Sequence, residues 1–265
     1  MNQKLSELLA KASEYEKQLP GLELPQGHPG SRPLSAWIDH TLLKPEATPE
    51  QVEKLCAEAA RCLFASVCVN PVYVPLAHRL LADSPLLSPV LVCTVVGFPL
   101  GATLTQSKVE ETRLAMDAGA AEIDMVIPVG LLKGGQYDAV ADDIQRVVDT
   151  AHARGALVKV ILEMALLTRF EKIAACLITQ MTGADFVKTS TGFGPGGATL
   201  EDVDLMRRVV GPQMGVKAAG GIRSLADARA MLQAGATRLG TSAGVKIVEE
   251  AGQTAPENLS TKENQ

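Results

Sequence analysis

Ala184-Asp185-Phe186-Val187-Lys188-Thr189-Ser190-Thr191-Gly192-Phe193-Gly194-Pro195-Gly196-Gly197 places a lysine at the end of a short apolar run and follows it with hydroxyl groups and glycines. A lysine buried without a partner is costly, so the pattern indicates a buried strand whose last side chain, Lys188, is paired or used. A strand-end lysine whose ammonium group simply reaches solvent is the alternative. The rest of the chain favours the first interpretation.

The same pattern recurs at even intervals on both sides of this stretch. Lys159 lies in the apolar run 157–163, and Lys217 lies in the run 215–219. Two further runs carry an acid instead, with Asp124 in 121–127 and Asp39 in 36–42. If these runs are neighbouring strands of one sheet, several opposite charges meet in a small volume.

The order of apolar runs and helical patterns predicts an α/β fold, a (β/α)8 TIM barrel. Eight short apolar runs lie near residues 36–42, 65–69, 90–96, 121–127, 157–163, 184–189, 215–219 and 237–241. Helical patterns follow them near residues 49–62, 72–83, 104–118, 135–154, 168–182, 199–210, 224–234 and 242–250. Such alternation predicts a parallel sheet with helices outside, and eight units within 265 residues favour a closed barrel over an open sheet.

The two ends of the chain are expected to lie outside the barrel. Residues 1–34 are predicted to form an extra amphipathic helix, which would cap the N-terminal end of the barrel, and a connector rich in proline and glycine. Residues 35–250 are the predicted catalytic barrel. Residues 251–265 are polar and without periodicity, so we expect a disordered tail.

The composition excludes several classes of protein. With 25 basic and 30 acidic residues, a net charge of −5 and 3% aromatic residues, nucleic acid is not an expected partner. No apolar stretch reaches the ~18 residues of a membrane span, and the start lacks a signal-peptide core. We therefore expect a cytoplasmic protein without a membrane partner. Its five cysteines lack Cys-x-x-Cys spacing and are interpreted as reduced packing residues.

The charged strand residues point to chemistry on a carbonyl group. Lys188 and Lys217 are expected on adjacent strands, at the C-terminal face where barrel active sites lie. A positive neighbour and partial burial lower the pKa of a lysine, and a neutral lysine attacks carbonyl carbon to give an imine. Asp124, opposite a protonated Lys217, could move protons through a bound water. A buried ion pair that only joins strands is the structural alternative, and residue type alone does not separate the two lysines.

A phosphate site is predicted on the same face. The loops after the last two strands of such barrels commonly bind phosphate through glycines, backbone amides and helix N-termini. The candidate residues are Gly220, Gly221 and Arg223 after the seventh strand and Gly240, Thr241 and Ser242 after the eighth. The expected substrate is a small phosphorylated carbonyl compound. Arg223 is either a phosphate ligand or solvated surface.

Two other kinds of site are not favoured. Gly192 to Gly197 fits the Gly-x-Gly-x-x-Gly dinucleotide fingerprint, but Lys217 stands at the next strand end, where the fingerprint requires an acid. The four histidines are scattered without ligand spacing, so no metal site is expected.

The chain resembles the deoxyribose-phosphate aldolase family in five segments. They are Ile38-Asp39-His40-Thr41-Leu42-Leu43-Lys44-Pro45, Val95-Val96-Gly97-Phe98-Pro99-Leu100-Gly101, Glu122-Ile123-Asp124-Met125-Val126, Phe186-Val187-Lys188-Thr189-Ser190-Thr191-Gly192-Phe193 and Val216-Lys217-Ala218-Ala219-Gly220-Gly221-Ile222-Arg223.

The resemblance implies a reaction and a role for each site residue. The reaction is reversible cleavage of 2-deoxy-D-ribose 5-phosphate to D-glyceraldehyde 3-phosphate and acetaldehyde, without a cofactor or metal. Lys188 would form the Schiff base, Lys217 would tune it and Asp124 would relay protons. Asp39 and Lys159 resemble supporting pocket residues. Substrate contacts are also expected from three residues in the same segments, Thr41, Thr189 and Gly192.

The chain departs from the family pattern at two places. Met164 follows Glu163 where the family more often has threonine, which could alter the pocket wall, and the C-terminal tail lacks the tyrosine that some members are thought to use as a proton carrier. The sequence does not fix the oligomeric state, and a homodimer is one expectation. Three interpretations remain open: a Schiff-base aldolase, a metal-dependent aldolase or isomerase, and a non-catalytic barrel that binds phosphoesters.

Overall fold

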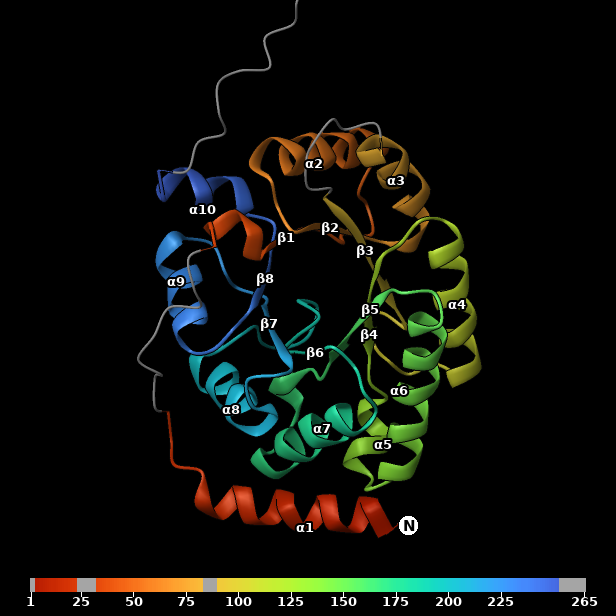
Figure 1. The fold of residues 1–265 in the computed structure, drawn as a ribbon, viewed down its shortest axis with the longest axis vertical. Helices are drawn as coiled ribbons and strands as arrows, with labels where there is room; N and C mark the ends of the chain where they lie inside the picture. Colours follow the sequence, from red (N-terminus) through yellow and green to blue (C-terminus); the bar gives the residue numbers. More distant parts are fainter. Residues whose placement is uncertain (1–2, 23–31, 83–89, 253–265) are drawn as a thin grey trace, which may run out of the picture.

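Eight parallel strands close into a barrel in which each strand is hydrogen-bonded to its neighbours in chain order (Figure 1). The computed structural model describes residues 3–22, 32–82 and 90–252. The strands are β1 (Ile38–Leu42), β2 (Ser66–Val69), β3 (Leu91–Val96), β4 (Glu122–Val126), β5 (Leu157–Ile161), β6 (Phe186–Lys188), β7 (Gly215–Ala219) and β8 (Arg238–Thr241). The predicted (β/α)8 barrel is confirmed, and each strand lies within or beside its predicted run.

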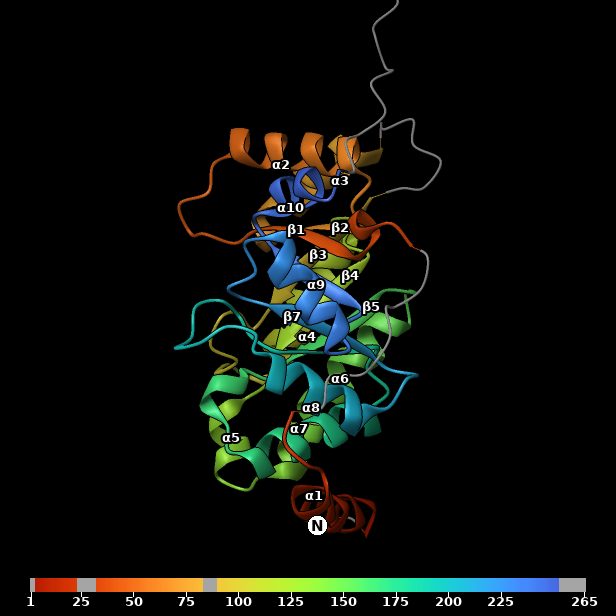
Figure 2. The same ribbon diagram turned by 90° about the vertical axis from the view of Figure 1, so that its left-hand side faces the viewer.

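A ring of helices surrounds the strands (Figures 1 and 2). The helices that follow successive strands are α2 (Pro49–Cys62), α3 (Val74–Ala82), α4 (Thr105–Asp117), α6 (Tyr137–His152), α7 (Arg169–Met181), α8 (Leu200–Val210), α9 (Leu225–Gln233) and α10 (Gly244–Glu250). The sequence analysis did not anticipate the short helix α5 (Val129–Lys133) or the 3-10 turns η1 (Leu34–Trp37), η2 (Pro71–Tyr73) and η3 (Met164–Leu166).

Helix starts follow the local sequence. The side chains of Thr48, Thr168 and Ser224 each accept a hydrogen bond from the third helical amide, and the residue at that position returns a bond to the cap. These reciprocal bonds satisfy amides that have no partner within the helix. The loops before α2, α7 and α9 are therefore anchored where these helices begin.

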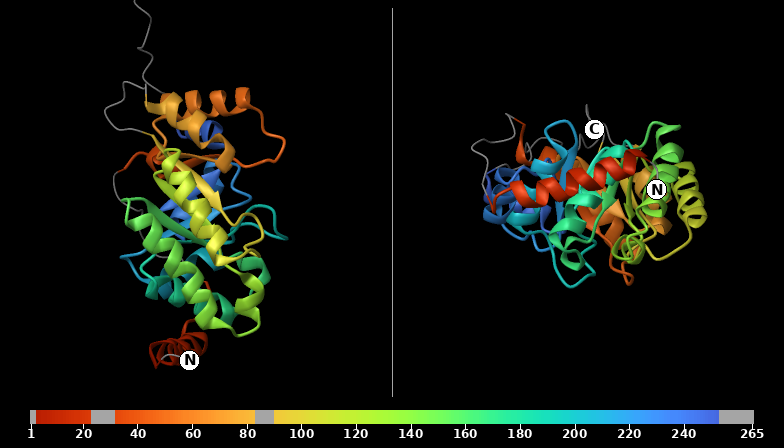
Figure 3. Two further views of the ribbon diagram at one scale, coloured as in Figure 1. Left: turned by 90° about the vertical axis from the view of Figure 1, so that its right-hand side faces the viewer. Right: turned by 90° about the horizontal axis from the view of Figure 1, so that it is seen from below.

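Helix α1 (Gln3–Gln18) packs along α7 on the outside of the ring, as Figures 1 and 3 show. All residues from Ile173 to Thr179 of α7 are buried, so this helix has no polar face to turn to solvent. A helix that is buried all round needs a cover on its outer side, and Leu5 and Ala12 of α1 are buried there. The extra N-terminal helix is confirmed, but its expected place at the N-terminal end of the barrel was wrong.

The main apolar core lies between the sheet and the ring of helices, while the charged side chains of the strands lie inside the barrel. Along β4, Ile123 and Met125 belong to the apolar core, whereas Glu122 and Asp124 alternate with them and face the interior. The predicted disordered tail falls from residue 253 onward outside the described residues, as do residues 23–31 of the connector. No helix in the described ranges has the length and hydropathy needed to cross a membrane.

One close contact inside the barrel tests this packing. Gly215 on β7 is the register partner of Phe186 on β6, and an added Cβ would lie 2.1 Å from the phenyl ring. We expect Gly215→Ala to lower the free energy of unfolding by about 1–3 kcal/mol, as overpacked cores do. Gly130→Ala is the control, because nothing lies within 4 Å of its Cβ position in α5. Urea denaturation measures both, and equal midpoints would contradict the contact.

Candidate active site

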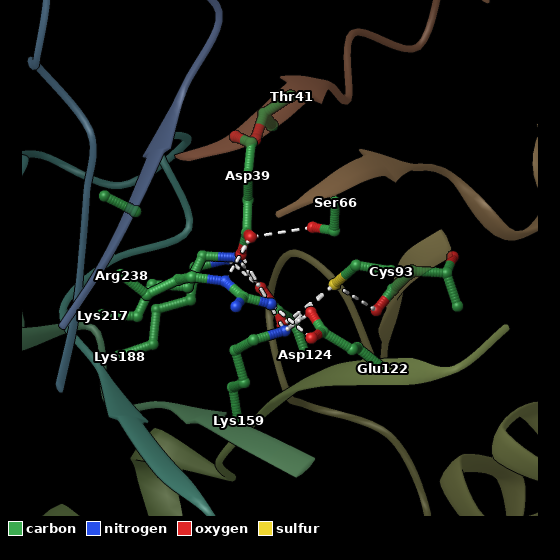
Figure 4. A network of polar contacts seen from close by, with 12 residues as sticks. Asp39, Thr41, Ser66, Cys93, Glu122, Asp124, Lys159, Lys188, Lys217 and Arg238 are labelled. Atoms are coloured by element: carbon green, nitrogen blue, oxygen red, sulfur yellow. Dashed lines mark hydrogen bonds and ion pairs between the residues drawn. The ribbon is translucent and has the colours of Figure 1, made fainter. Parts of the chain in front are cut away.

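One carboxylate inside the barrel accepts hydrogen bonds from three lysines (Figure 4). Lys159 Nζ lies 3.0 Å from Asp124 Oδ1, and the Nζ atoms of Lys188 and Lys217 each lie 2.7 Å from Asp124 Oδ2. The lysines come from β5, β6 and β7, three successive strands, so their side chains converge on one side of β4. The structure thus brings together the three residues that the sequence predicted as catalytic.

Two further carboxylates extend the network toward the start of the strands. Asp39 Oδ2 lies 2.5 Å from Lys217 Nζ, and Asp39 Oδ1 accepts hydrogen bonds from Arg238 Nε at 2.5 Å and from Ser66 Oγ at 2.7 Å. Glu122 accepts a bond from Lys159 Nζ at 2.6 Å and another from Arg238. Arg238 therefore bridges two carboxylates that each hold a different lysine.

The connected charges do not cancel. Among the described residues, the network holds four basic side chains and three carboxylates: Lys159, Lys188, Lys217 and Arg238 with Asp39, Glu122 and Asp124. If all are ionised, one positive charge is in excess. An uncompensated charge in a buried place lowers the stability of the folded protein. The charges of this network balance when one lysine is neutral.

The pKa directions indicate which groups stay charged. Burial by itself would raise the pKa of Asp124, but the three lysines outweigh it and hold that pKa well below its usual range. Burial would likewise lower the pKa of Lys217, yet Asp124 and Asp39 outweigh it and raise that pKa. The pKa of Lys159 is raised for the same reason, chiefly by Asp124 against burial. Lys159, Lys217 and Asp124 are thus all ionised at neutral pH.

Lys188 has the fewest anionic partners of the three lysines. It contacts one carboxylate, whereas Lys217 contacts two, and Lys159 lies within 4.0 Å of three. Lys188 is therefore the lysine of this site that the fewest ion pairs hold. It is also the last residue of β6, so its amine is followed directly by the loop at the C-terminal face.

The predicted phosphate loops offer free backbone amides at the same face. The amides of Gly192, Gly221 and Ser242 have no hydrogen-bond partner among the described residues, and all three residues are exposed. Gly192 and Gly221 adopt φ values of +85°, which glycine reaches without strain. These amides can receive an anion.

The N-terminus of α9 is less open than the sequence suggested. The backbone amides of Arg223 and Ser224 both donate to Asp227 Oδ2 at 3.0 Å, so the helix start already holds an anionic group. The Arg223 side chain is exposed and has no described ion-pair partner. The backbone amide of Arg223 is therefore not free for phosphate.

Several predicted substrate-contact residues also have partners within the protein. The Thr189 hydroxyl donates to Ala219 O and accepts from Ala219 N, both at 3.0 Å, which joins β6 to β7. Thr41 Oγ1 donates to Asp39 O at 2.8 Å, and Thr241 Oγ1 donates to Ile222 O at 2.8 Å. Gly240 leaves room for Lys217, because a Cβ there would lie 3.1 Å from Lys217 Cε.

The glycine-rich segment after β6 packs against another loop. A Cβ on Gly197 would lie 2.4 Å from Gly220 O, and Ala198 N donates to that oxygen at 3.0 Å. Gly197 and Gly220 are therefore required for close contact between the two backbones. This contact accounts for the last glycine of the apparent dinucleotide fingerprint.

Two cysteines belong to the site, which the sequence analysis did not foresee. Cys93 Sγ lies 3.2 Å from Asp124 Oδ1, and the neighbouring Cys68 thiol has a lowered pKa, through its hydrogen bond with Cys93 and despite burial. Within the described ranges, these thiols and Asp124 form the one group with metal-ligand spacing. The lysine ammonium groups bonded to the same carboxylate oppose a metal cation there. All five cysteines are free.

Sequence reasoning missed Arg238, Glu122 and Ser66 as members of the site. Two of them had a visible signal: Arg238 is a cation in the eighth apolar run, and Glu122 lies two residues before Asp124, on the same face of a strand. Ser66 had none, because buried serines are common in strands. Met164, expected in the pocket wall, is buried in the apolar core instead.

Comparisons with known proteins identify the family of this chain. The model of the DeoC/LacD family aldolases matches residues 35–250. A protein of Halalkalibacterium halodurans named deoxyribose-phosphate aldolase is 59% identical over 218 residues, 82% of this chain and 96% of its own length. A solved chain from Coccidioides immitis superposes with a TM-score of 0.87 at 41% identity, covering 95% of this chain and 98% of that one. A deoxyribose phosphate aldolase of Aeropyrum pernix, described as tetrameric, gives 0.77 at 33% identity, covering 95% and 99%.

The bridging arginine yields a stability prediction. Arg238→Met removes the cation that Asp39 and Glu122 share, so we expect the free energy of unfolding to fall by about 3–5 kcal/mol, the usual cost of breaking a buried ion pair. Arg113→Met is the control, because Arg113 pairs with Glu110 and Asp117 at the surface, where such pairs contribute little. Urea denaturation compares them, and similar losses in both variants would contradict the role of Arg238.

Proposed function

Because the chain belongs to the DeoC/LacD aldolase family, we propose that it reversibly cleaves 2-deoxy-D-ribose 5-phosphate to D-glyceraldehyde 3-phosphate and acetaldehyde. This reaction makes it a carbon–carbon lyase. The observation that carries the proposal is a buried lysine at a strand end, Lys188, with a carboxylate at 2.7 Å and a second lysine on that same carboxylate oxygen.

Lys188 is the proposed nucleophile. It has the fewest carboxylate partners, and the network has balanced charge when this amine is neutral. The neutral Nζ attacks the C1 aldehyde carbon of the open-chain sugar and forms a carbinolamine. Protonation of its hydroxyl group and loss of water then give a protonated imine, which restores the positive charge beside Asp124 Oδ2.

The protonated imine draws electrons from the bond that breaks. A base removes the proton of the C3 hydroxyl, the C2–C3 bond cleaves and D-glyceraldehyde 3-phosphate leaves. The electron pair moves into the imine, which becomes a neutral enamine. Protonation at C2 and hydrolysis then release acetaldehyde and return the free amine of Lys188.

Asp124 and Lys217 are the proposed proton-transfer pair. Lys217 Nζ and Asp124 Oδ2 lie 2.7 Å apart, so a proton can pass between them or to a water in the pocket. Asp39 and Lys159 keep their proposed supporting role, since each fixes one of these two groups by an ion pair. Residues 251–265 contain no tyrosine that could carry protons. From residue 253 onward they lie outside the described residues.

The phosphate is proposed to bind the free amides of Gly192, Gly221 and Ser242. The substrate would then extend from the buried amine of Lys188 to the exposed rim. No organic cofactor or metal is part of this proposal. Assembly as a homodimer and a cytoplasmic location remain predictions.

Substitution of the two lysines should have different effects. Lys188→Leu should abolish both turnover and the two-carbon adduct that borohydride traps with acetaldehyde, while circular dichroism shows an intact fold. Lys217→Leu should keep the adduct on Lys188 but form it roughly tenfold or more slowly at neutral pH, with a more alkaline optimum, because a neighbouring cation no longer favours the neutral amine.

Peptide mapping of the adduct in the active wild-type protein distinguishes the alternatives. An adduct on Lys217, or one that persists in Lys188→Leu, would reverse the assignment. A metal-dependent aldolase would form no adduct and would lose activity in EDTA. A non-catalytic barrel would bind phosphoesters and show neither property.

The phosphate group of the substrate should contribute strongly to the rate of cleavage. If the rim amides bind it, 2-deoxyribose should have a kcat/KM at least about a hundredfold lower than its 5-phosphate, because two or more charge-assisted hydrogen bonds are lost. Steady-state cleavage rates for both sugars measure this ratio. Comparable values would remove the phosphate site from the proposal.

A further inference from the structure

Glu163 is a buried carboxylate outside the charge network. Its residue is 4% exposed, and no cation forms an ion pair with it in the described ranges. Its backbone is in the left-handed region, with φ 56° and ψ 59°, which is unfavourable for a residue other than glycine. Strained backbone of this kind persists where the surrounding structure enforces it, frequently at functional sites.

The carboxylate of Glu163 holds the loop that follows the reactive lysine. Glu163 Oε2 accepts hydrogen bonds from the hydroxyl of Thr191 and, at 3.3 Å, from its amide. Thr191 Oγ1 in turn accepts a bond from Phe193 N at 3.0 Å. Of the described residues, Glu163 is the only one outside the segment 190–197 that hydrogen-bonds to it.

The loop also curls around this carboxylate. An added Cβ on Gly194 would lie 2.9 Å from Glu163 Oε1, so a larger residue there would have to displace the carboxylate. Oε1 itself is buried and has no hydrogen-bond partner in the described structure. Between the two contact points lies Gly192, at φ +85°, with its amide free.

We propose that Glu163 is a positioning residue that clamps the loop 191–194 and thereby presents the Gly192 amide to the phosphate end of the substrate. The proposal rests on the proposed function, because it assigns the clamp to the same site. Glu163 does not touch the reacting atoms: it acts on Lys188 chemistry only through where the sugar phosphate is held. The clamp therefore affects substrate binding rather than imine formation.

Kinetics with two substrates test the clamp. Alanine is as unfavourable as glutamate in the left-handed conformation of residue 163, so Glu163→Ala changes only the two hydrogen bonds. Without them, KM for 2-deoxyribose 5-phosphate should rise roughly tenfold or more. The rate of borohydride-trapped adduct formation with acetaldehyde, which has no phosphate, should stay within about twofold. Thr191→Val should reproduce this pattern, whereas Glu163→Gln and Thr191→Ser should restore most of the affinity.

The interaction between Glu163 and Thr191 and the hydrogen exchange of the loop are measured in separate experiments. The double variant Glu163→Ala/Thr191→Val should cost less than the sum of the two single changes, because both break the bond between the Thr191 hydroxyl and Glu163 Oε2. Hydrogen–deuterium exchange at Thr191 and Phe193 should accelerate in Glu163→Ala. Unchanged exchange, an unchanged KM, or adduct formation falling in parallel with cleavage would each overturn the proposal. A wild-type protein with no cleavage and no adduct would refute the proposed function instead, and the exchange measurement would still decide the clamp.

Discussion

The ion pairs of Asp124 are the interaction on which the interior of this barrel depends. A carboxylate at the barrel axis is tolerated because three lysines donate to it, and the lysines are tolerated because carboxylates accept from them. The site is therefore built at a cost in stability that only mutual pairing offsets. Removing Asp124 would leave three buried lysines without the carboxylate that they share.

The network among the described residues holds one more basic group than carboxylates, and the proposed reaction of a neutral lysine depends on this difference. A fully matched set of ion pairs would hold every lysine protonated, and no amine could attack a carbonyl carbon. Here Lys188 contacts only one carboxylate, and it also ends the shortest strand, β6. The proposed anion site uses free backbone amides of the neighbouring loops rather than charged side chains.

Much of the fold and part of the site could be predicted from sequence, for separable reasons. Strand runs, helix periodicity and caps such as Thr48 are local, and the lysines of three strands stood out because charge in an apolar run is rare. The place of α1 could not be predicted, since it depends on the uncovered face of α7. Likewise nothing in the sequence indicated that Asp227 accepts a hydrogen bond from the Arg223 amide, or that the Glu163 backbone is in the left-handed region.

The order of charges along the chain has a consequence for how the barrel forms. All three carboxylates of the network lie on β1 and β4, in the first half, and all four cations lie on β5 to β8, in the second. Neither half-barrel can neutralise its own interior, so a fragment ending after β4 would bury only like charges. The two halves carry opposite charges. The buried carboxylates and cations can therefore form ion pairs only when the barrel closes.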